Sequence, residues 1–311
     1  MLTWDDSSAD PPRVGYEVPF YADHADAGDL ARKGALSQGE IDLFQDLLAD
    51  VLLERVHAPA EGHPLSVHLI SVVEHALHAL EADPELARLV RAESIRLNGE
   101  PQAGPRKAFA RALEDGTVIA ALDAEPQVRL HGDLFLENIL WRPAEVVRAP
   151  AADPADPADP AARRAAAPPH ATEPSISPRL LLIDPVSVAG VVRGPPIFDL
   201  VKYESYATGE LPALRSEWVD VRGFDGEPDY SNQIRWQSAQ LAPFRTFDWH
   251  TRFRRAFEAK YGPVDSRAYR LIDGYFSVAM AVNTGGTQRR ARLLKATQDF
   301  NAAGAGHPGV T

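Results

Sequence analysis

The sequence predicts an α+β fold that is mostly helical, with a few short strands beside its most specialised polar residues. Apolar residues recur at helical spacing over several long stretches. Short apolar runs flank "HGDLFLEN" (131–138), and another, "RLLLIDP" (179–185), ends in an aspartate. With 311 residues, 45% of them hydrophobic, the chain can bury a sizeable core as one large domain or two lobes.

Composition and charge exclude several classes of function. The net charge of −12 argues against a nucleic-acid-binding face and against binding to an anionic membrane. The absence of cysteine excludes disulfides, thiolate metal sites and cysteine nucleophiles. No run approaches the roughly 18 apolar residues of a membrane span, and the first residues lack a basic segment followed by an apolar one. We therefore expect a cytoplasmic protein, while its oligomeric state is not indicated.

The elements follow in order along the chain. "RVGYEVPFY" (13–21) is rich in Val, Tyr and Phe and predicts a strand. The stretch 37–58 predicts a helix, because Ser37 and Glu40 form a capping box ahead of apolar residues at helical spacing. Further helices are expected over 65–80, 83–97, 105–114, 197–207, 246–261, 266–283 and 287–303. Short strands are expected over 127–131, 138–142 and 180–184, and an irregular acidic stretch over 210–235.

The segment 143–178 differs from the rest in composition. It contains three tandem Ala-Asp-Pro units and almost no large apolar residues. Such a segment cannot bury enough surface to offset the entropy lost on ordering. We therefore expect an Ala/Pro/Asp-rich disordered insertion at about 146–176, which limited proteolysis should cut first and which the fold should not need.

The central motif carries residue types that phosphoryl transfer requires. That reaction needs a carboxylate to accept the proton of the attacking hydroxyl, and magnesium ions to neutralise the phosphates. Mg²⁺ prefers hard oxygen ligands, supplied by one or two protein groups together with phosphate oxygens and water. Asp133 and Asn138 offer a carboxylate and an amide oxygen a short loop apart, and Asp184 offers a second carboxylate at the end of an apolar strand.

The motifs "HGDLFLENIL" and "LLIDPVSVAGVVRGPPIFDLVKY" together resemble the aminoglycoside phosphotransferase and choline kinase family, which has the protein-kinase-like fold. That family carries His-x-Asp-x-x-x-x-Asn on its catalytic loop, an aspartate at the end of a following strand, and a later Gly-x-Pro-x-x-Asp-Leu segment. The resemblance spans most of the chain, but its sharp motifs lie only in 129–142 and 180–203. It implies a protein-kinase-like C-lobe with short catalytic-loop strands and a stub of the N-lobe sheet.

The resemblance also implies roles for individual residues. Asp133 would be the catalytic base, and His131 would orient the loop. Asn138 and Asp184 would bind Mg²⁺ and, through it, the co-substrate ATP or another nucleoside triphosphate. Asp199 would be a buried structural acid. The expected acceptor is a hydroxyl of a small molecule, such as an aminoglycoside, an amino-alcohol or a sugar-like compound.

The chain departs from the family in its N-lobe. Family members carry a Gly-rich loop over the phosphates and a strand lysine that pairs with them. None of the five lysines of this chain lies in such a strand ahead of 13–21. Residues 1–21 are therefore expected to be a remnant of N-lobe strands and hinge, with the C-lobe over 22–311. The true start would lie upstream, or the N-lobe would be lost together with activity.

The residues leave other functions open. A catalytically silent kinase-like module that binds a ligand or partner is the main alternative, and a metal-dependent phosphohydrolase using Asp133 and Asp184 is a weaker one. Acidic residues after the metal aspartate could attract a cationic acceptor, although a solvated acidic loop is the commoner explanation. These residues are Glu210, Glu217, Asp220, Asp225, Glu227 and Asp229.

Overall fold

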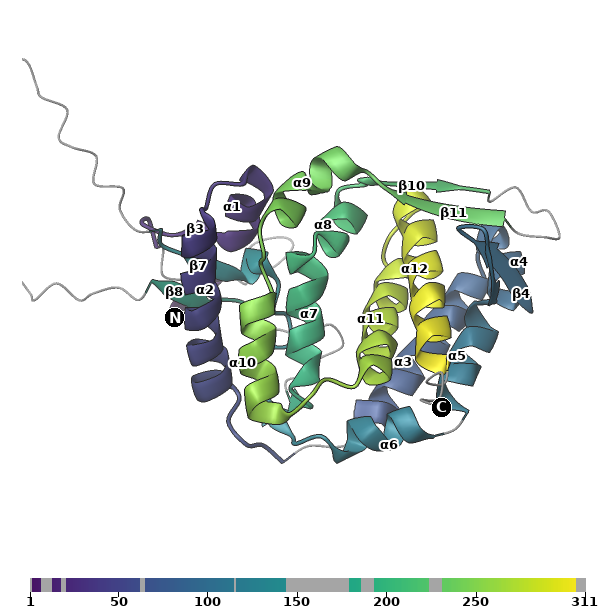
Figure 1. The fold of residues 1–311 in the computed structure, drawn as a ribbon, viewed down its shortest axis with the longest axis horizontal. Coiled ribbons are helices and arrows are strands. Elements are labelled where there is room, and N and C mark those ends of the chain that lie inside the picture. Colours follow the sequence, from purple (N-terminus) through teal and green to yellow (C-terminus); the bar gives the residue numbers. More distant parts are fainter. Residues whose placement is uncertain are drawn as a thin grey trace, which may run out of the picture.

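The structure, a computed structural model, shows helices packed side by side with small sheets at either end (Figure 1). It describes residues 2–6, 13–17, 21–61, 65–114, 116–143, 179–185, 193–223 and 231–305. The predicted insertion at 146–176 lies outside these residues. The α-helices are α1 Ala27–Lys33, α2 Gln38–Val51, α3 Leu65–Glu81, α4 Pro84–Arg91, α5 Pro105–Leu113, α6 Thr117–Ala124, α7 Ile197–Ala207, α8 Glu210–Arg215, α9 Ser238–Thr246, α10 Thr251–Tyr261, α11 Ser266–Ala281 and α12 Gly286–Gly304. A π-helical turn, η1 Leu52–Val56, continues α2, and a 3₁₀ turn, η2 Leu136–Asn138, follows the central motif.

The strands form short ladders. The strands are β1 Leu2–Asp6, β2 Arg13–Glu17, β3 Ala25–Asp26, β4 Ser94–Leu97, β5 Glu100–Ala103, β6 Val128–Arg129, β7 Ile139–Trp141, β8 Leu180–Leu182, β9 Arg193–Gly194, β10 Val219–Arg222 and β11 Ser231–Trp236. Within the described ranges, the strand orders are β1-β2, β3-β7-β8, β6-β9 and β10-β11-β4-β5. The β3-β7-β8 sheet lies beside α1 and α2, while the β10-β11-β4-β5 sheet lies at the opposite end over α12 (Figure 1).

Local sequence signals explain where several helices begin. Ser37 and Glu40 form the capping box that opens α2, as predicted. Asp83 caps α4 by accepting from Glu85 N at 2.9 Å, with Pro84 at the first helical position. By contrast, α7 and α11 are buried around most of their circumference, which is typical of central helices whose stability comes from packing.

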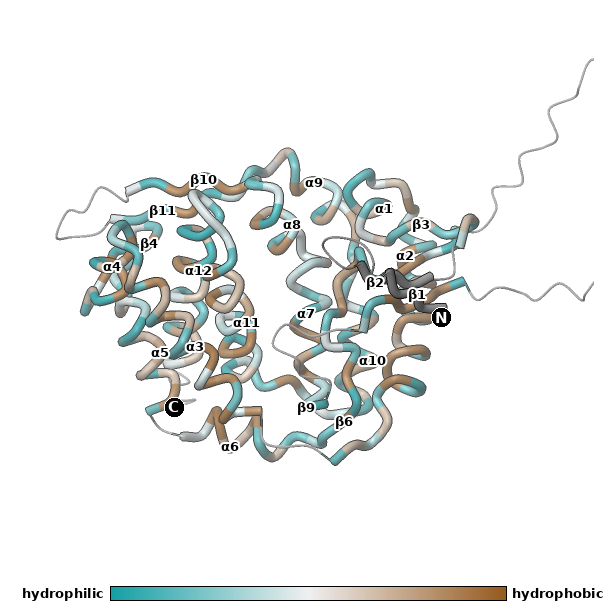
Figure 2. Tube along the Cα trace, turned by 180° about the vertical axis from the view of Figure 1, so that it is seen from behind, coloured by the Kyte–Doolittle hydropathy of each residue, from teal (hydrophilic) through white to brown (hydrophobic). Residues whose placement is uncertain are grey.

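The core connects the helices to the strands that flank the central motif. Phe44 on α2 packs edge-on against Trp141 on β7, with ring centroids 5.5 Å apart, and against Trp249 at 5.9 Å. All three side chains are essentially inaccessible to solvent. The apolar residues of α2 therefore hold β7, which directly follows Asn138, in a fixed position. Elsewhere in the chain, apolar residues of α3 and α6 stand out along the tube when the molecule is seen from behind (Figure 2).

One predicted helix is wrong over its second half. The prediction of helix over 83–97 holds only to Arg91, and Ser94–Leu97 is strand β4, which pairs antiparallel with β5. The burial of β4 alternates, with Ile95 and Leu97 inside. Asn98 and Gly99 connect the strands with φ values of 52° and 89°. A two-residue Asn-Gly connection is a strong hairpin signal, because it requires positive φ at both positions.

Two further predictions need correction. The stretch 210–235, expected to be irregular, contains α8 and the antiparallel hairpin β10-β11, whose inward residues Val219 and Ile234 are buried. The single helix expected over 246–261 is instead α10 preceded by α9, with a break at 247–250. Asp248 causes the break, because its carboxylate accepts from the backbone N–H groups that open α10.

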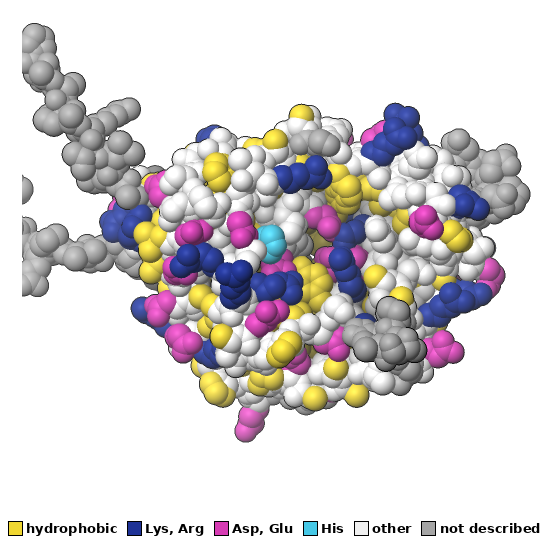
Figure 3. Space-filling model, viewed as in Figure 1, with side chains coloured by type: hydrophobic (Ala, Val, Ile, Leu, Met, Phe, Trp, Pro, Cys, Tyr) yellow, Lys and Arg dark blue, Asp and Glu magenta, His cyan; other side chains and the backbone are white. Residues whose placement is uncertain are grey.

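The other predicted elements are confirmed within a few residues, including the three strands beside the central motif, which are shorter than expected. The chain is a mixed α+β protein, as predicted. The space-filling view shows the surface hollowed near its centre, between the α7–α8 side and the α11–α12 side (Figure 3). Across the part of the chain that the structure describes, no helix combines the length and apolar composition needed to cross a membrane.

Candidate functional site

The loop that follows β6 is held by a buried carboxylate. Asp199 on α7 is fully buried, and its two oxygens accept from the backbone N–H groups of His131 and Gly132, each at 2.8 Å. His57 Nε2 lies 3.0 Å from the same carboxylate. Gly132 has φ of 81°, a conformation that favours glycine. Asp199 therefore fixes the path of the backbone immediately ahead of Asp133.

His131 connects this loop to the end of β8. Its Nε2 donates to the carbonyl oxygen of Ile183 at 3.0 Å. Burial lowers the pKa of His131 below its usual value, although the Asp199 carboxylate opposes the shift. A neutral imidazole with the proton on Nε2 suits this contact. The N–H of Ile183 in turn donates to the carbonyl of Asn138 at 3.0 Å, so the end of β8 is bonded to both parts of the central motif.

Asp133 lies between an amide and a buried ammonium group. Asn138 Nδ2 donates to the backbone carbonyl of Asp133 at 2.8 Å and to its Oδ2 at 3.2 Å. Lys202 Nζ contacts Oδ1 at 3.0 Å. Because the amide nitrogen of Asn138 faces Asp133, its oxygen is directed elsewhere. The Asp133 side chain is 25% exposed, so the carboxylate is within reach of a small molecule.

Asp184 stands at the end of β8 with an unusual backbone conformation. Its φ is 51°, in the left-handed region that Asp and Asn adopt more readily than other side chains. It is exposed, and among the described residues its carboxylate has no hydrogen bond or ion pair. Both Asp184 and Asp133 act electrostatically on His131. The hydrogen bonds of Ile183 thus place the backbone of Asp184 next to the loop that carries Asp133 and Asn138.

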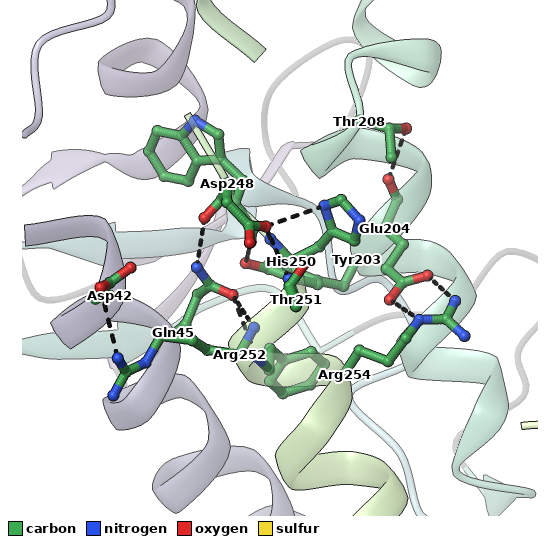
Figure 4. Close-up of polar contacts among 12 residues, drawn as sticks. Asp42, Gln45, Tyr203, Glu204, Thr208, Asp248, His250, Thr251, Arg252 and Arg254 are labelled. Atoms are coloured by element: carbon green, nitrogen blue, oxygen red, sulfur yellow. Dashed lines mark hydrogen bonds and ion pairs between the residues drawn. The ribbon is translucent and has the colours of Figure 1, made fainter. Parts of the chain in front are cut away.

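The helix that carries Asp199 and Lys202 is anchored to α10. Tyr203 OH donates to the carbonyl of Trp249, and Glu204 accepts from Arg254 Nε at 2.8 Å (Figure 4). Gln45 on α2 completes this network. Its Nε2 donates to the carbonyl of Asp248 at 2.6 Å, and its Oε1 accepts from the first N–H groups of α10 at 3.0 and 3.1 Å. Gln45 therefore supplies a cap to α10 from another helix.

We expect Gln45→Ala to lower the free energy of unfolding by about 2–3 kcal/mol, because it leaves buried backbone N–H groups without acceptors. Urea unfolding followed by circular dichroism measures this. Gln38→Ala is the matched control, because Gln38 lies on the same helix and contacts the same Asp248, donating to its carbonyl at 3.3 Å and accepting from its N–H at 3.0 Å. Gln38 is nearer to solvent, however, and among the described residues it makes no contact with the N–H groups of α10. An equal loss in both variants would contradict the capping role.

A pocket lies beside Asp133, between α7, α8, α11 and α12. The pocket is small: the volume open to water in it is about 30 Å³, which is room for about two water molecules. It is lined by Phe135, Lys202, Ser205, Glu210, Leu211, Leu214, Asp273, Phe276, Ser277, Met280 and Arg292. Lys202 Nζ lies 4.3 Å from the centroids of both the Phe135 and Phe276 rings. Because Lys202 also contacts Asp133, the pocket adjoins the candidate base.

Buried charges form one wall of this pocket. Lys295 on α12 contacts Glu210 at 2.6 Å, Asp273 at 2.7 Å and also Asp299. Arg270 contacts Asp299 at 3.2 Å. Three carboxylates therefore share two cations. Burial raises the pKa of Glu210 above its usual value and that of Asp299 to about 8, so the cluster retains a proton near neutral pH.

This cluster predicts a specific pH dependence. In the unfolded chain the Asp299 carboxyl group has its ordinary pKa of 3.8, whereas burial in the folded protein raises this pKa to about 8. Between these values the folded state binds more protons, so the free energy of unfolding should fall as pH rises. Asp299→Asn should flatten this fall, as measured by urea unfolding between pH 4 and pH 8. The exposed Asp46→Asn is the control, and an unchanged slope in Asp299→Asn would contradict the prediction.

The acidic residues that could attract a cationic acceptor lie apart from one another where the structure describes them. Glu210 lines the pocket, whereas Asp220 lies on β10 and pairs with Arg222 at 2.9 Å. Glu217 lies in the turn after α8. The remaining three, Asp225, Glu227 and Asp229, lie outside the described residues.

Sequence reasoning missed the cations of the pocket, Lys202 and Arg292, and the acid Asp273. A signal existed for Lys202, because a lysine inside the apolar helical stretch "IFDLVKY" has no solvent-exposed side to occupy. Arg292 and Asp273 gave no such signal, since each stands in a sequence that reads as an ordinary amphipathic helix. Their burial follows from the packing of α11 against α12.

The acidic and histidine side chains do not form a ready-made metal site in the described part of the chain. Among the residues that the structure describes, no group of three or more His, Cys, Asp or Glu side chains is arranged to hold a metal ion. The predicted metal site contains only one such side chain, Asp184, together with the amide oxygen of Asn138. The histidines of 57–78, which the sequence also placed close together, likewise form no metal site in the described part of this segment.

Comparison with known proteins identifies structural similarity only. No model of a known protein family matches the chain, and no curated protein sequence matches it. Among solved structures, a glucosamine kinase in complex with glucosamine, ADP and inorganic phosphate shares 15% identity with a TM-score of 0.44, over 91% of this chain and 62% of that one. Glucosamine kinase in crystal form B shares 16% identity with a TM-score of 0.42, over 91% and 60%. The chain spans less than two thirds of the length of these structures.

Proposed function

We propose that this chain belongs to a small-molecule phosphotransferase of the aminoglycoside phosphotransferase and choline kinase type and has the arrangement of a protein-kinase-like C-lobe. The reaction would move the γ-phosphate of ATP to a hydroxyl of an aminoglycoside, amino-alcohol or sugar-like acceptor. The observation that carries this proposal is the bonded arrangement of the central loop, the end of β8 and Asp199. Hydrogen bonds connect the loop that carries Asp133 and Asn138 to Asp199 and to Ile183, the residue before Asp184, and this supports the proposal.

Asp133 is suited to act as a general base. A carboxylate has about four lone-pair positions, so the contacts with Asn138 and Lys202 leave room to accept from an acceptor hydroxyl. The hydroxyl would enter from the pocket between α7 and α11. Rates in this chemistry come mainly from positioning and charge stabilisation, and Asp199 and His131 supply the positioning by fixing the loop.

The residues present fit a magnesium ion. Asp184 offers a carboxylate without another described partner, and Asn138 offers an amide oxygen because its nitrogen is bonded to Asp133. Both are hard oxygen donors, and Mg²⁺ is commonly held by one or two protein ligands with phosphate oxygens and waters completing the octahedron. When bound, the ion would neutralise charge on the phosphates. The strained φ of Asp184 is the kind of backbone feature found at functional sites.

A binding module without turnover is the second candidate. It is favoured by the ion pair between Lys202 and Asp133, since a buried ammonium group on the carboxylate competes with an incoming hydroxyl. Burial lowers the pKa of Lys202 below its usual value, while Asp133 opposes the shift. A charged Lys202 would weaken Asp133 as a base.

The two candidates are separated by measuring ATP consumption with a panel of amino-alcohols, aminoglycosides and amino sugars, with and without Mg²⁺. The phosphotransferase predicts acceptor-dependent and Mg²⁺-dependent formation of ADP and a phosphorylated acceptor, detected by ³¹P NMR. A panel member that binds by calorimetry without being phosphorylated would instead support the binding module.

A further inference from the structure

An arginine on α12 is buried and has no partner among the residues that the structure describes. Arg292 is 2% exposed and lines the pocket beside Asp133. Within the described residues it makes no hydrogen bond or ion pair, and its Nε is completely enclosed without an acceptor. The neighbouring cations are paired with carboxylates. Lys202 contacts Asp133 at 3.0 Å, and Arg215 contacts Glu137 at 2.5 Å.

An unpaired guanidinium in such a position is energetically unfavourable. Buried charges in proteins are normally paired and hydrogen-bonded, and an uncompensated one carries a large desolvation penalty. Burial, together with the charge of Arg215, lowers the pKa of Arg292 to about 10. Arg292 also acts electrostatically on Lys202, so the positive charges add up at one end of the pocket. A negatively charged ligand group would relieve both effects.

We propose that Arg292 and Lys202 form an oxyanion-binding site at the end of the pocket that adjoins Asp133. The planar guanidinium suits bidentate contact with a phosphate or carboxylate, and the ammonium supplies a second, point-like charge. Phe135, Phe276 and Leu214 line the same pocket and reduce its access to water. The carboxylates Glu210 and Asp273 also line the pocket, but each is paired with Lys295.

Two sources can supply such an oxyanion, the terminal phosphate of a nucleotide or an acidic group on the acceptor molecule. The oxyanion site would bind its ligand whether or not the chain transfers phosphate. Together with the carboxylates that line the same pocket, the site would orient a small molecule that carries charges of both signs.

The test is thermal unfolding of four proteins in phosphate, in acetate and in chloride at equal ionic strength. The proteins are the unaltered chain, Arg292→Met, Arg292→Lys and the control Arg290→Met. Arg290 lies on the same helix, but its side chain is 34% exposed and pairs with Glu85. At roughly ten times the dissociation constant of phosphate, we expect Tm of the unaltered chain to rise by about 2–5 °C.

Arg292→Met should lose this rise, yet melt in chloride at the same temperature as the unaltered chain or higher, because it removes an unpaired buried charge. Arg290→Met should keep the rise, and Arg292→Lys should bind phosphate about tenfold more weakly because it lacks the bidentate fork. A rise that persists in Arg292→Met, or no rise in the unaltered chain with either phosphate or acetate, would overturn the proposal. If Arg292→Met does not fold, unchanged phosphate affinity in Arg292→Lys would do the same.

A second arm of the same experiment identifies the source of the oxyanion. ATP without Mg²⁺ replaces phosphate in the unaltered chain and in Arg292→Met or, where that variant does not fold, in Arg292→Lys. Loss or weakening of the ATP-induced rise in the variant assigns the site to the nucleotide. An ATP-induced rise that remains, while the phosphate-induced rise is lost or weakened, assigns the site to an acidic group of the acceptor.

Discussion

Asp133→Asn should remove phosphotransfer activity almost completely while leaving the protein folded. The amide cannot take up the proton of the acceptor hydroxyl, and a positioned general base contributes about 10²–10⁴-fold to rate. Asn nearly matches Asp in shape and can still contact Asn138, so the loop should keep its conformation. We expect a fall in kcat with a smaller change in the KM of the acceptor, measured by ADP release in the presence of Mg²⁺.

Asp50→Asn provides the control for this loss. Asp50 is an exposed carboxylate on α2 that pairs with Arg55 at 2.8 Å, and its substitution should leave kcat unchanged. Thermal unfolding of Asp133→Asn establishes that the variant is folded. A folded Asp133→Asn protein that retains more than about a tenth of the activity would contradict the role of Asp133 as the base, since even the lower end of the expected effect exceeds this.

Asp199→Ala should produce a large loss of stability. It leaves the N–H groups of His131 and Gly132 without acceptors and removes one of the partners of His57, which keeps its contact with Tyr261. Deleting one partner of a buried charged contact costs about 3–5 kcal/mol, which is a large part of the roughly 5–15 kcal/mol that stabilises a domain. Urea unfolding measures the loss, and amide hydrogen exchange at His131 and Gly132 should become faster.

Asp199→Asn separates hydrogen bonding from packing at the same position. Its carbonyl oxygen can still accept one of the two N–H groups, whereas its amide nitrogen faces the other, so the loss should be intermediate. If Asp199→Ala lowered the free energy of unfolding by less than about 1 kcal/mol, water or other groups would be accepting from the N–H groups of His131 and Gly132. That result would contradict the role of Asp199 in holding the loop.

Local signals in the sequence predicted the elements whose ends depend on neighbouring residues. The capping box at Ser37 and the Asp83-Pro84 pair placed two helix starts correctly, because capping involves residues within one turn. The Asn98-Gly99 connection was an equally local signal that was overlooked, and the helix expected there failed as a result. The central motif could be singled out from the sequence because its carboxylate and amide groups are the kinds of group that phosphoryl transfer requires.

Long-range packing explains what the sequence could not predict. β11 pairs in parallel with β4, more than a hundred residues away, and no local pattern indicates that pairing. The isolation of Arg292 likewise depends on which residues α7, α8 and α11 bring around α12. Whether a polar side chain is paired or unpaired is decided by tertiary contacts, and the oxyanion site could therefore be inferred only from the structure.

In the proposed function, Asn138 and Asp184 would hold a metal ion beside Asp133. The most direct measurement is anomalous scattering from crystals grown with Mn²⁺, as a substitute for Mg²⁺, and ADP. We predict a peak near both the amide oxygen of Asn138 and the Asp184 carboxylate, at close to the distance of about 2.1 Å that Mg²⁺ prefers. A metal peak elsewhere, or an Asp184 carboxylate turned away from Asp133 with ADP bound, would contradict the account.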